Sequence, residues 1–269
     1  MDHLQDKPVV RVERRGAACW IFIDREERRN ALNPDVLAGI EAALRRDAVM
    51  PGVRAVVLSG MGNKAFCAGA DLSRGTGVFG DAASEPTTDF GRLARMAREL
   101  PVPMIARVNG ACVAGGMGLL AMCDLAVAAD HARFGLPEAK VGVFPMQVLV
   151  YLRHLVAPRH VNELCFMGDL VDAARAREMG LVNAVVSAGE LDGHVAAMVE
   201  RIAACSPRAI HRGRVAIHGM EGMAFHAALS YAETQITVAA GTPDAREGLA
   251  AFNERRSPRW AAAQGAGHD

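Results

Sequence analysis

Two glycine-rich segments have the residue types and spacing needed to bind an oxyanion. In the first, the apolar run Met104–Val108 leads through Asn109-Gly110 to Gly115-Gly116-Met117-Gly118, which opens a short apolar segment. In the second, Phe66–Asp71 (FCAGAD) follows the apolar run Val53–Ser59. Glycine lets the backbone approach a ligand closely, and the first N–H groups of a helix have no partner within it. Turns of this kind can hold an anion or the negative oxygen of a transition state.

The first glycine turn also fits a dinucleotide-binding fingerprint. Gly116–Ala121 matches G-x-G-x-x-A, and Glu138 lies about where a ribose-binding acid is found. The spacing argues against this interpretation, because only about two helical turns fit before Asp124, whereas a βαβ unit needs about 30 residues. The acid is also expected nearer Asp130. Two loops at neighbouring strand ends could instead each offer one N–H to the same oxygen, although tight packing of small residues explains the spacing equally well.

The rest of the chain predicts an α/β fold that would position these turns. Val9–Val12 and Cys19–Asp24 are expected to form a hairpin, and the near-continuous apolar runs predict buried strands at Val53–Ser59, Met104–Val108 and Leu125–Ala129. A last strand is predicted at Val182–Val186. Helices are predicted over Asn33–Arg46, Asp89–Leu100, Met146–Val156, Arg159–Met167, Ala173–Met179, Glu190–Ala204, Pro207–His218, Met223–Ala240 and Pro243–Asn253. Strands alternating with helices, followed by helices alone, indicate one α/β core with a helical C-terminal region. Ser73–Thr88 has no apolar period and is equally well explained as a linker or a substrate lid.

The composition of the chain indicates which kinds of binding partner to expect. The formal net charge is zero and the pI is about 7.1, so nothing indicates binding to nucleic acid or to an anionic membrane. No apolar run approaches the roughly 20 residues of a membrane span, and the polar N-terminus is unlike a signal peptide. The six cysteines form no CxxC pair and the nine histidines no HExxH motif, so neither disulfides nor a metal site is expected. We therefore expect a soluble, cytoplasmic protein with buried free thiols.

From Val9 to about Trp260 the chain resembles the enoyl-CoA hydratase/isomerase (crotonase) superfamily. The matching segments are Arg29–Leu32, Ala65–Leu72, Val108–Gly110 with Gly115-Gly116, Cys123-Asp124, Phe134–Glu138, Gly180–Val182 and Phe252–Pro258. The resemblance implies an α/β fold, a spiral of βββα repeats, with residues 1–200 holding the CoA and acyl sites. Residues 201–269 would form a helical region that closes the site and makes homotrimers or dimers of trimers. The implied partner is an acyl-CoA substrate, with coenzyme A as part of the substrate and no prosthetic group.

The same resemblance assigns roles to individual residues. The backbone N–H groups of Ala70 and Gly115 would bind the thioester oxygen. The residues implied in CoA binding are Arg25, Arg28, Arg29, Ala31, Ala68, Asp71, Leu72 and Arg255. A solvated surface position explains the four arginines equally well. Asp71 and Asp124 are expected to have structural rather than catalytic roles, by accepting hydrogen bonds from loop or helix-end N–H groups.

One departure from the family pattern limits the prediction of the reaction. Two-glutamate hydratases of this family carry one acid on the short helix after the glycines, and here that position is Gly118. The second acid is present as Glu138, so Glu138 would carry the proton chemistry alone, with a pKa raised by apolar neighbours such as Phe144 and Met146. Gly118, Phe144 and Met146 are expected to line the acyl pocket. The alternative is that Glu138 is an exposed loop carboxylate or a helix cap.

The resemblance, together with these residues, implies an enzyme that hydrates or isomerises the double bond of an enoyl-CoA in fatty-acid or branched-acid degradation. Polarising the thioester stabilises the enolate-like charge, and one carboxylate can then move a proton. A Δ3-Δ2-enoyl-CoA isomerase and an acyl-CoA hydrolase are the alternatives among enzymes. A catalytically idle acyl-CoA-binding assembly protein is the alternative of another class, because the first acid is missing.

Overall fold

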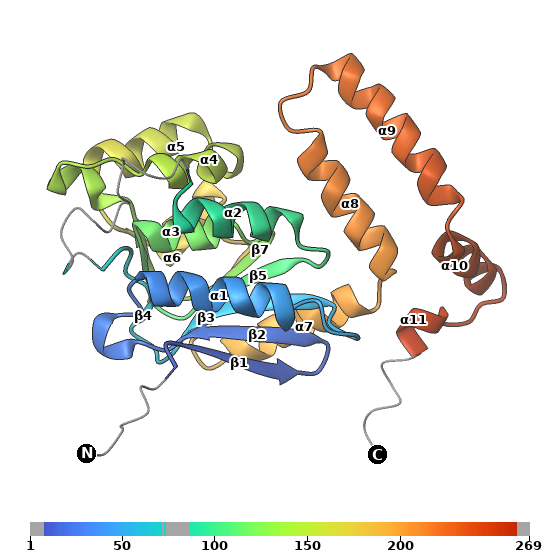
Figure 1. The fold of residues 1–269 in the computed structure, drawn as a ribbon, viewed down its shortest axis with the longest axis horizontal. Coiled ribbons are helices and arrows are strands. Elements are labelled where there is room, and N and C mark those ends of the chain that lie inside the picture. The colour runs from blue at the N-terminus through green and yellow to red at the C-terminus, as the bar shows by residue number, and fades with distance from the viewer. Residues whose placement is uncertain (1–7, 72, 74–86, 263–269) are drawn as a thin grey trace.

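Two sheets organise the structure, a computed structural model that describes residues 8–71, 73 and 87–262 (Figure 1). The six-stranded sheet has the order β1-β2-β3-β5-β7-β10, and all its neighbouring strands are parallel except the hairpin β1-β2. Its strands are β1 (Val10–Arg15), β2 (Ala18–Ile23), β3 (Ala55–Gly60), β5 (Met104–Val108), β7 (Leu125–Ala129) and β10 (Ala184–Val186). The hairpin and the buried strands predicted near Val53–Ser59, Met104–Val108 and Leu125–Ala129 are therefore confirmed, whereas the last predicted strand is shorter, Ala184–Val186, and half-buried.

The central strands β2, β3, β5 and β7 of the six-stranded sheet are buried on both faces, which explains why they have continuous apolar sequences. Neighbouring residues of a strand point to opposite faces. Ile21 and Leu58 accordingly pack in one core cluster with α1 (Pro34–Arg46) and α2 (Asp89–Glu99), whereas Trp20 and Val57 pack in another with α7 (Leu191–Ala203). Figure 1 shows α1 and α2 on one side of this sheet and α7 on the other.

A smaller sheet carries the turns that the sequence analysis singled out. It has the order β4-β6-β8-β9, in which β4, β6 and β8 are parallel and β9 is antiparallel to β8. Its strands are β4 (Ala65–Cys67), β6 (Ala111–Val113), β8 (Arg133–Gly135) and β9 (Val171–Asp172). The chain passes from the large sheet to the small one three times, from β3 to β4, β5 to β6 and β7 to β8. This repeated path is the predicted spiral, and the α/β fold class is confirmed.

Short helices connect the strands. They are η1 (Glu26–Arg28), α3 (Gly115–Ala121), η3 (Pro137–Val141), α4 (Met146–Leu155), α5 (Pro158–Asn162), the π-helix η4 (Glu163–Met167) and α6 (Ala173–Met179). Two of them, α3 and α6, pack against the small sheet. The caps explain several boundaries, because the side chains of Asn33, Thr88 and Asp172 accept hydrogen bonds from the first turns of α1, α2 and α6. The helix predicted over Arg159–Met167 is divided, with α5 giving way to the π-helix after Asn162.

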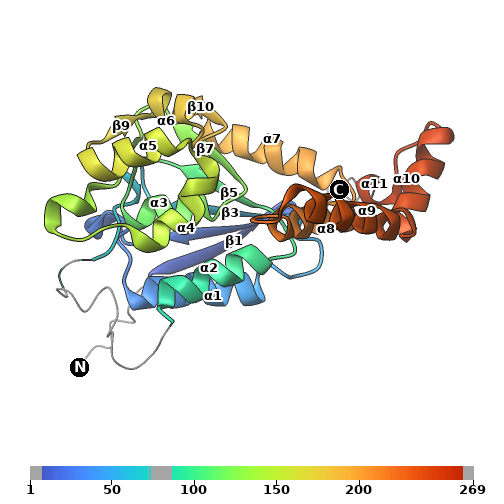
Figure 2. The same cartoon turned by 90° about the horizontal axis from the view of Figure 1, so that it is seen from above.

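The last helices extend away from the sheets, as Figure 2 shows. They are α8 (Pro207–Gly219), α9 (Phe225–Ala240), α10 (Pro243–Asn253) and α11 (Arg259–Ala262). Arg214 of α8 is 6% exposed and anchors this region. Its Nε lies 2.9 Å from both carboxylate oxygens of Asp124, and its other nitrogens donate to the carbonyls of Ala97, Arg98 and Leu100 at the end of α2. The domain boundary expected at residue 200 falls within α7 and stays a prediction.

Among the described residues, no helix is both long and apolar enough to cross a bilayer. In the same part of the chain, no three His, Cys, Asp or Glu side chains are grouped as metal ligands would be. The linker or lid expected at Ser73–Thr88 lies almost entirely outside the described residues, as does Leu72.

Candidate active site

Three parallel strands of the small sheet bring the predicted catalytic groups to one edge. Cys67 of β4 pairs with Cys112 of β6, and Val113 of β6 pairs with Gly135 of β8. Ala70 follows Cys67 by three residues, Gly115 follows Cys112 by three, and Glu138 follows Gly135 by three. The carboxyl ends of neighbouring parallel strands lie at the same edge of a sheet. The register therefore places Ala70, Gly115 and Glu138 in adjacent positions.

The N–H groups of Ala70 and Gly115 are free and close together. Leu32 donates to the carbonyl of Gly69 at 2.7 Å and accepts from Asp71 N at 2.8 Å, so this bridge uses the carbonyl before Ala70 and the N–H after it, but not the N–H of Ala70 itself. Gly115 is the first residue of α3, where an N–H has no helical partner. A Cβ added to Gly115 would lie 3.7 Å from Ala70 N. Neither N–H donates to another group of the described chain, and two adjacent free donors can hold an oxyanion.

Unusual backbone conformations bring the two loops into contact. Gly69 has φ +92° and Ala114 has φ 53°, a region that residues with side chains rarely adopt. A Cβ on Gly69 would lie 2.7 Å from the Cβ of Ala114, so only glycine permits this approach. The N–H of Ala114 donates to the carbonyl of Gly135 at 2.9 Å, which joins the same turn to the strand that precedes Glu138.

Glu138 is a buried carboxylate. It is the second residue of η3, is 9% exposed, and its Oε2 atom has no hydrogen-bond partner among the described residues. Burial raises the pKa of Glu138 above its usual value, as the sequence analysis predicted. Burial, and then the nearby Glu138 charge, raise the pKa of Cys165 to about 11. A buried carboxylate without a partner is costly for stability, and such groups occur most often where a proton must be moved.

The two residues expected to line the acyl pocket near Glu138 differ in their surroundings. Phe144 is partly buried against the core, and its ring centroid lies 6.2 Å from that of Phe166. Met146 is 68% exposed at the start of α4. The Met146 side chain in the single chain therefore contributes little to the burial of Glu138.

At Gly118, the space that a side chain would take is already occupied. A Cβ added there would lie 2.5 Å from Cζ of Phe90 and 3.1 Å from Cγ2 of Val148. Phe90 is on the first turn of α2 and Val148 is on α4. An acidic side chain at position 118 would therefore require the Phe90 ring to move. The sequence analysis missed this role of Phe90, because its helical spacing with Leu93 indicates only a packing position.

The residues implied in CoA binding do not form one cluster. Arg25 donates to the carbonyl of Ala31 at 2.7 Å and to Asp71 Oδ2 at 2.9 Å, and both side chains of this ion pair are 13% exposed. The Ser73 hydroxyl and then Arg25 lower the pKa of Asp71 to about 2. Ala68 donates its N–H to the carbonyl of Arg29 at 3.1 Å. The structure thus brings Arg25, Ala31 and Asp71 together beside the loop that carries Ala70.

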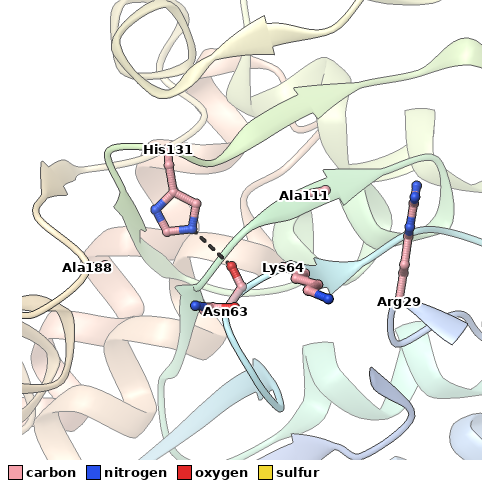
Figure 3. A pocket seen from close by; sticks show the side chains of 6 residues that line it. All are labelled: Arg29, Asn63, Lys64, Ala111, His131 and Ala188. Carbon is pink, nitrogen blue, oxygen red and sulfur yellow. Dashed lines mark hydrogen bonds between the residues drawn. The ribbon is translucent and has the colours of Figure 1, made fainter. Parts of the chain in front are cut away.

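The remaining arginines are exposed at separate places. Arg28 lies in η1, and Arg255 follows α10 in the C-terminal region. Arg29 lines a cavity of about 640 Å³ (Figure 3). The other lining residues are Asn63, Lys64, Ala111, His131 and Ala188. Ala111 begins β6, so this cavity is at the opposite end of that strand from Gly115.

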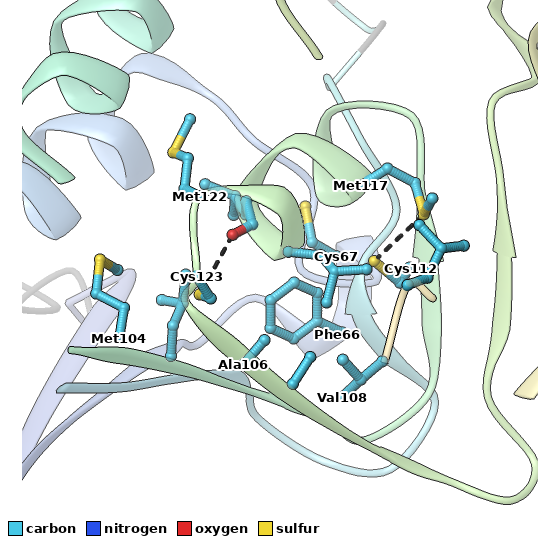
Figure 4. Packing of buried hydrophobic residues seen from close by; sticks show 14 of the residues in the cluster. Phe66, Cys67, Met104, Ala106, Val108, Cys112, Met117, Met122 and Cys123 are labelled. Carbon is cyan, nitrogen blue, oxygen red and sulfur yellow. Dashed lines mark hydrogen bonds between the residues drawn. The ribbon is translucent and has the colours of Figure 1, made fainter. Parts of the chain in front are cut away.

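Sulfur-containing side chains pack beneath the glycine turns, as Figure 4 shows. Cys67, Cys112 and Cys123 are buried, and Cys112 Sγ lies 3.9 Å from Met117 Sδ. Burial raises the pKa of the Cys67 thiol to about 12, so it stays protonated at neutral pH. All six cysteines are free and five are buried, which confirms the expectation except at the exposed Cys205. The carboxylate of Asp124 also accepts from Met104 N at 2.7 Å, and this confirms its structural role.

Comparison with known proteins gives a consistent result over nearly the whole chain. A sequence profile described as enoyl-CoA hydratase/isomerase matches residues 13–263. A Thermus thermophilus protein provisionally named an enoyl-CoA hydratase is 35% identical, over 94% of this chain and 100% of the relative. A crotonyl-CoA hydratase of Syntrophomonas wolfei is 32% identical, over 89% of this chain and 93% of the relative. The crystal structure of an enoyl-CoA hydratase from Mycobacterium smegmatis has a TM-score of 0.85 and 33% identity, and the match covers 94% and 99% of the two chains.

Proposed function

Because this chain belongs to the enoyl-CoA hydratase/isomerase family, we propose that it hydrates or isomerises the double bond of an enoyl-CoA. The observation that carries this proposal is the position of two free N–H donors and one buried carboxylate at adjacent strand ends. The coenzyme A portion is part of the substrate, and the reaction needs no prosthetic group. Ala70 and Gly115 are the donors and Glu138 is the acid/base.

The two N–H groups stabilise the charge that develops on the thioester oxygen. When a proton leaves C2, or when water adds to C3, an electron pair moves onto the thioester and gives an enolate. Each oxyanion-hole donor contributes about 3 kcal/mol to such a transition state. The apolar core around β4, β6 and α3 keeps bulk water away and strengthens these hydrogen bonds.

Glu138 moves the proton in either reaction. In isomerisation, its carboxylate removes a proton from C2 of a β,γ-unsaturated thioester, the double bond shifts to C2–C3, and the proton is delivered to C4. In hydration, the carboxylate removes a proton from water as the C3–O bond forms, and it then returns a proton to C2. The raised pKa of Glu138 suits both roles, because the group must accept and release a proton near neutral pH.

The C-terminal helices support assembly into trimers or dimers of trimers. No residue of α9 is buried, and the side chains of Phe225, Ile236 and Phe252 are 74%, 67% and 81% exposed. Large apolar side chains gathered on one extended region are typical of surfaces that another subunit covers. Free, mostly buried thiols also fit a reducing compartment such as the cytoplasm.

Product analysis of purified protein with 2-enoyl- and 3-enoyl-CoA substrates tests the proposed reaction. We expect 3-hydroxyacyl-CoA or a shifted double bond, and a fall of about 100-fold or more in turnover for Glu138→Gln. Binding of CoA itself should be nearly unchanged in this variant. Glu178→Gln, at a 68% exposed side chain, is the matched control and should keep wild-type turnover.

Other outcomes of this experiment would contradict the proposal. A fully active Glu138→Gln variant would remove Glu138 from the chemistry. Release of free CoA without a change in the double bond would identify a hydrolase. Tight acyl-CoA binding without turnover of any substrate would identify an idle binding protein.

A further inference from the structure

We propose that Phe90 is a specificity-determining residue that limits the access of water to the acyl group and sets the ratio of isomerisation to hydration. The inference rests on the proposed function and adds a residue to it that lies on a different helix from the proposed catalytic groups. It starts from the contact between the Phe90 ring and Gly118.

The position of Gly118 relative to the proposed oxyanion hole defines the space in question. Gly118 follows Gly115 by three residues in α3, and residues three apart lie on the same side of a helix. A side chain at position 118 would therefore lie on the same side of α3 as position 115, one turn from the end of the helix where the N–H groups are unpaired. Glycine within a helix costs about 1 kcal/mol relative to alanine. The contact with Phe90 accounts for a glycine here, because even a methyl group would lie 2.5 Å from Cζ of the ring.

Hydrogen bonds between α2 and α4 keep the Phe90 ring against Gly118. The Oγ1 atom of Thr88, which caps α2, accepts from Gly91 N at 3.0 Å and from Gln147 Nε2 at 2.5 Å. The hydroxyl of Tyr151 donates to the carbonyl of Ala94 at 2.5 Å, four residues further along α4 and six further along the chain of α2. Two such links on either side of Phe90 fix the first turn of α2 relative to α4, which also supplies Val148.

An apolar wall at this position affects hydration and isomerisation differently. A water molecule in a buried site needs two or more polar partners to be held in place. Phe90, Val148 and Gly118 offer no side-chain donor or acceptor, so of these three residues and Glu138 only Glu138 could hold the attacking water. Isomerisation needs no water, because Glu138 alone transfers the proton from C2 to C4. The Phe90 ring therefore favours isomerisation over hydration.

The test compares the two reactions in one assay. Wild-type protein and Phe90→Ala are given trans-3-hexenoyl-CoA and trans-2-hexenoyl-CoA, and the rates of forming the shifted alkene and the 3-hydroxyacyl product are measured. We expect the ratio of hydration to isomerisation to rise about tenfold or more in Phe90→Ala. Met96→Ala is the control, because Met96 is a partly buried residue of the same helix. It should change stability without changing the ratio.

A double variant tests whether the space at Gly118 is the cause. Gly118→Glu alone is expected to hydrate poorly, since Phe90 occupies the room that the new side chain needs. Phe90→Ala/Gly118→Glu is expected to hydrate faster than either single variant. Such non-additivity is typical of residues in direct contact.

The two proposals fail in different ways. Wild-type protein that acts on neither hexenoyl-CoA contradicts the proposed function. Wild-type protein that acts on either substrate, with the same product ratio in folded Phe90→Ala, overturns the inference about Phe90 alone. Circular dichroism and thermal melting establish that each variant is folded.

Discussion

The guanidinium of Arg25 and the carboxylate of Asp71 form an ion pair, with 2.9 Å between Nη2 and Oδ2, directly beside the loop that carries Ala70. Arg25 also binds the carbonyl of Ala31. The pair therefore connects the turn at η1 to the segment that offers one of the two N–H donors. We infer that it positions the Ala70 N–H group.

Replacing Arg25 should weaken the proposed oxyanion hole. Arg25→Met leaves the Asp71 carboxylate without its cation, so we expect about a tenfold fall in kcat with a smaller change in KM, since the lost interaction acts on the transition state. Steady-state kinetics with an enoyl-CoA measures both constants. Arg46→Met, at a 75% exposed side chain at the end of α1, is the control. A change in KM alone would instead indicate that Arg25 contacts the CoA group.

The pH dependence of turnover should report the environment of Glu138. A general base must be deprotonated, so kcat/KM is expected to fall as the pH drops through the raised pKa of Glu138. The acidic limb should therefore lie clearly above the ordinary glutamate pKa of about 4.3. A pH–rate profile on folded protein measures it. An acidic limb at or below the ordinary value would contradict a buried Glu138 as the base.

The same buried carboxylate should make the protein less stable at neutral pH than it would be without the charge. The pKa of Glu138 is higher in the folded state than in the unfolded state, so the folded protein binds the proton more tightly. Stability is then lost as the pH rises through the interval between the two pKa values. Glu138→Gln should have a higher Tm than wild type at pH near 7, and the difference should shrink toward pH about 4. A lower Tm at neutral pH would show that Glu138 has a stabilising partner.

Removing Arg214 should detach the C-terminal helices from the core. Arg214→Met leaves Asp124 partly buried without its ion-pair partner and frees the carbonyls at the end of α2. Breaking a buried ion pair on one side typically costs about 3 kcal/mol or more. Urea unfolding measures the loss, and hydrogen exchange should show reduced protection in α8. Arg208→Met, which removes a 61% exposed side chain paired with Asp244, should cost less than about 1 kcal/mol.

The apolar residues of α9 predict an oligomer in solution. Light scattering coupled to gel filtration should give a mass of three or six times 28.5 kDa. Phe225→Asp with Ile236→Asp should shift the protein toward the monomer, because the charges would be buried in the interface. A monomeric wild-type protein would contradict the proposal, and an unchanged mass of the variant would place the interface elsewhere.

The sequence predicted the large sheet better than the small one. Strands such as Ala55–Gly60 are buried on both faces, and their continuous apolar sequences identify them directly. The strands of the small sheet have only two or three residues, which is too short for any period to be visible. These short strands nevertheless determine the site, because their pairing brings Ala70, Gly115 and Glu138 to one edge.

Tertiary contacts explain what could not be predicted about the site. Gly118 was identified as a missing acid, but only the structure places the Phe90 ring in that space. Arg25 was expected to bind CoA, whereas its contact with Asp71, 46 residues away, depends on how two loops fold together. The contacts of Asn109 also depend on tertiary folding. Its side-chain amide donates to the carbonyls of Gly62 and Ala65, in a turn more than 40 residues earlier in the chain.

Arg214 connects the C-terminal helices, where subunit contacts are proposed, to α2, which carries Phe90. The Arg214 guanidinium donates a hydrogen bond to the carbonyl of Ala97 in the last turn of α2. The first turn of the same helix holds the Phe90 ring against Gly118. One rigid helix thus joins the region proposed for subunit contacts to the proposed acyl wall. Thermodynamic reciprocity requires that any change in acyl-CoA affinity on assembly be matched by an equal change in the assembly constant on binding acyl-CoA. Dilution experiments with and without ligand therefore measure the same coupling free energy from both directions.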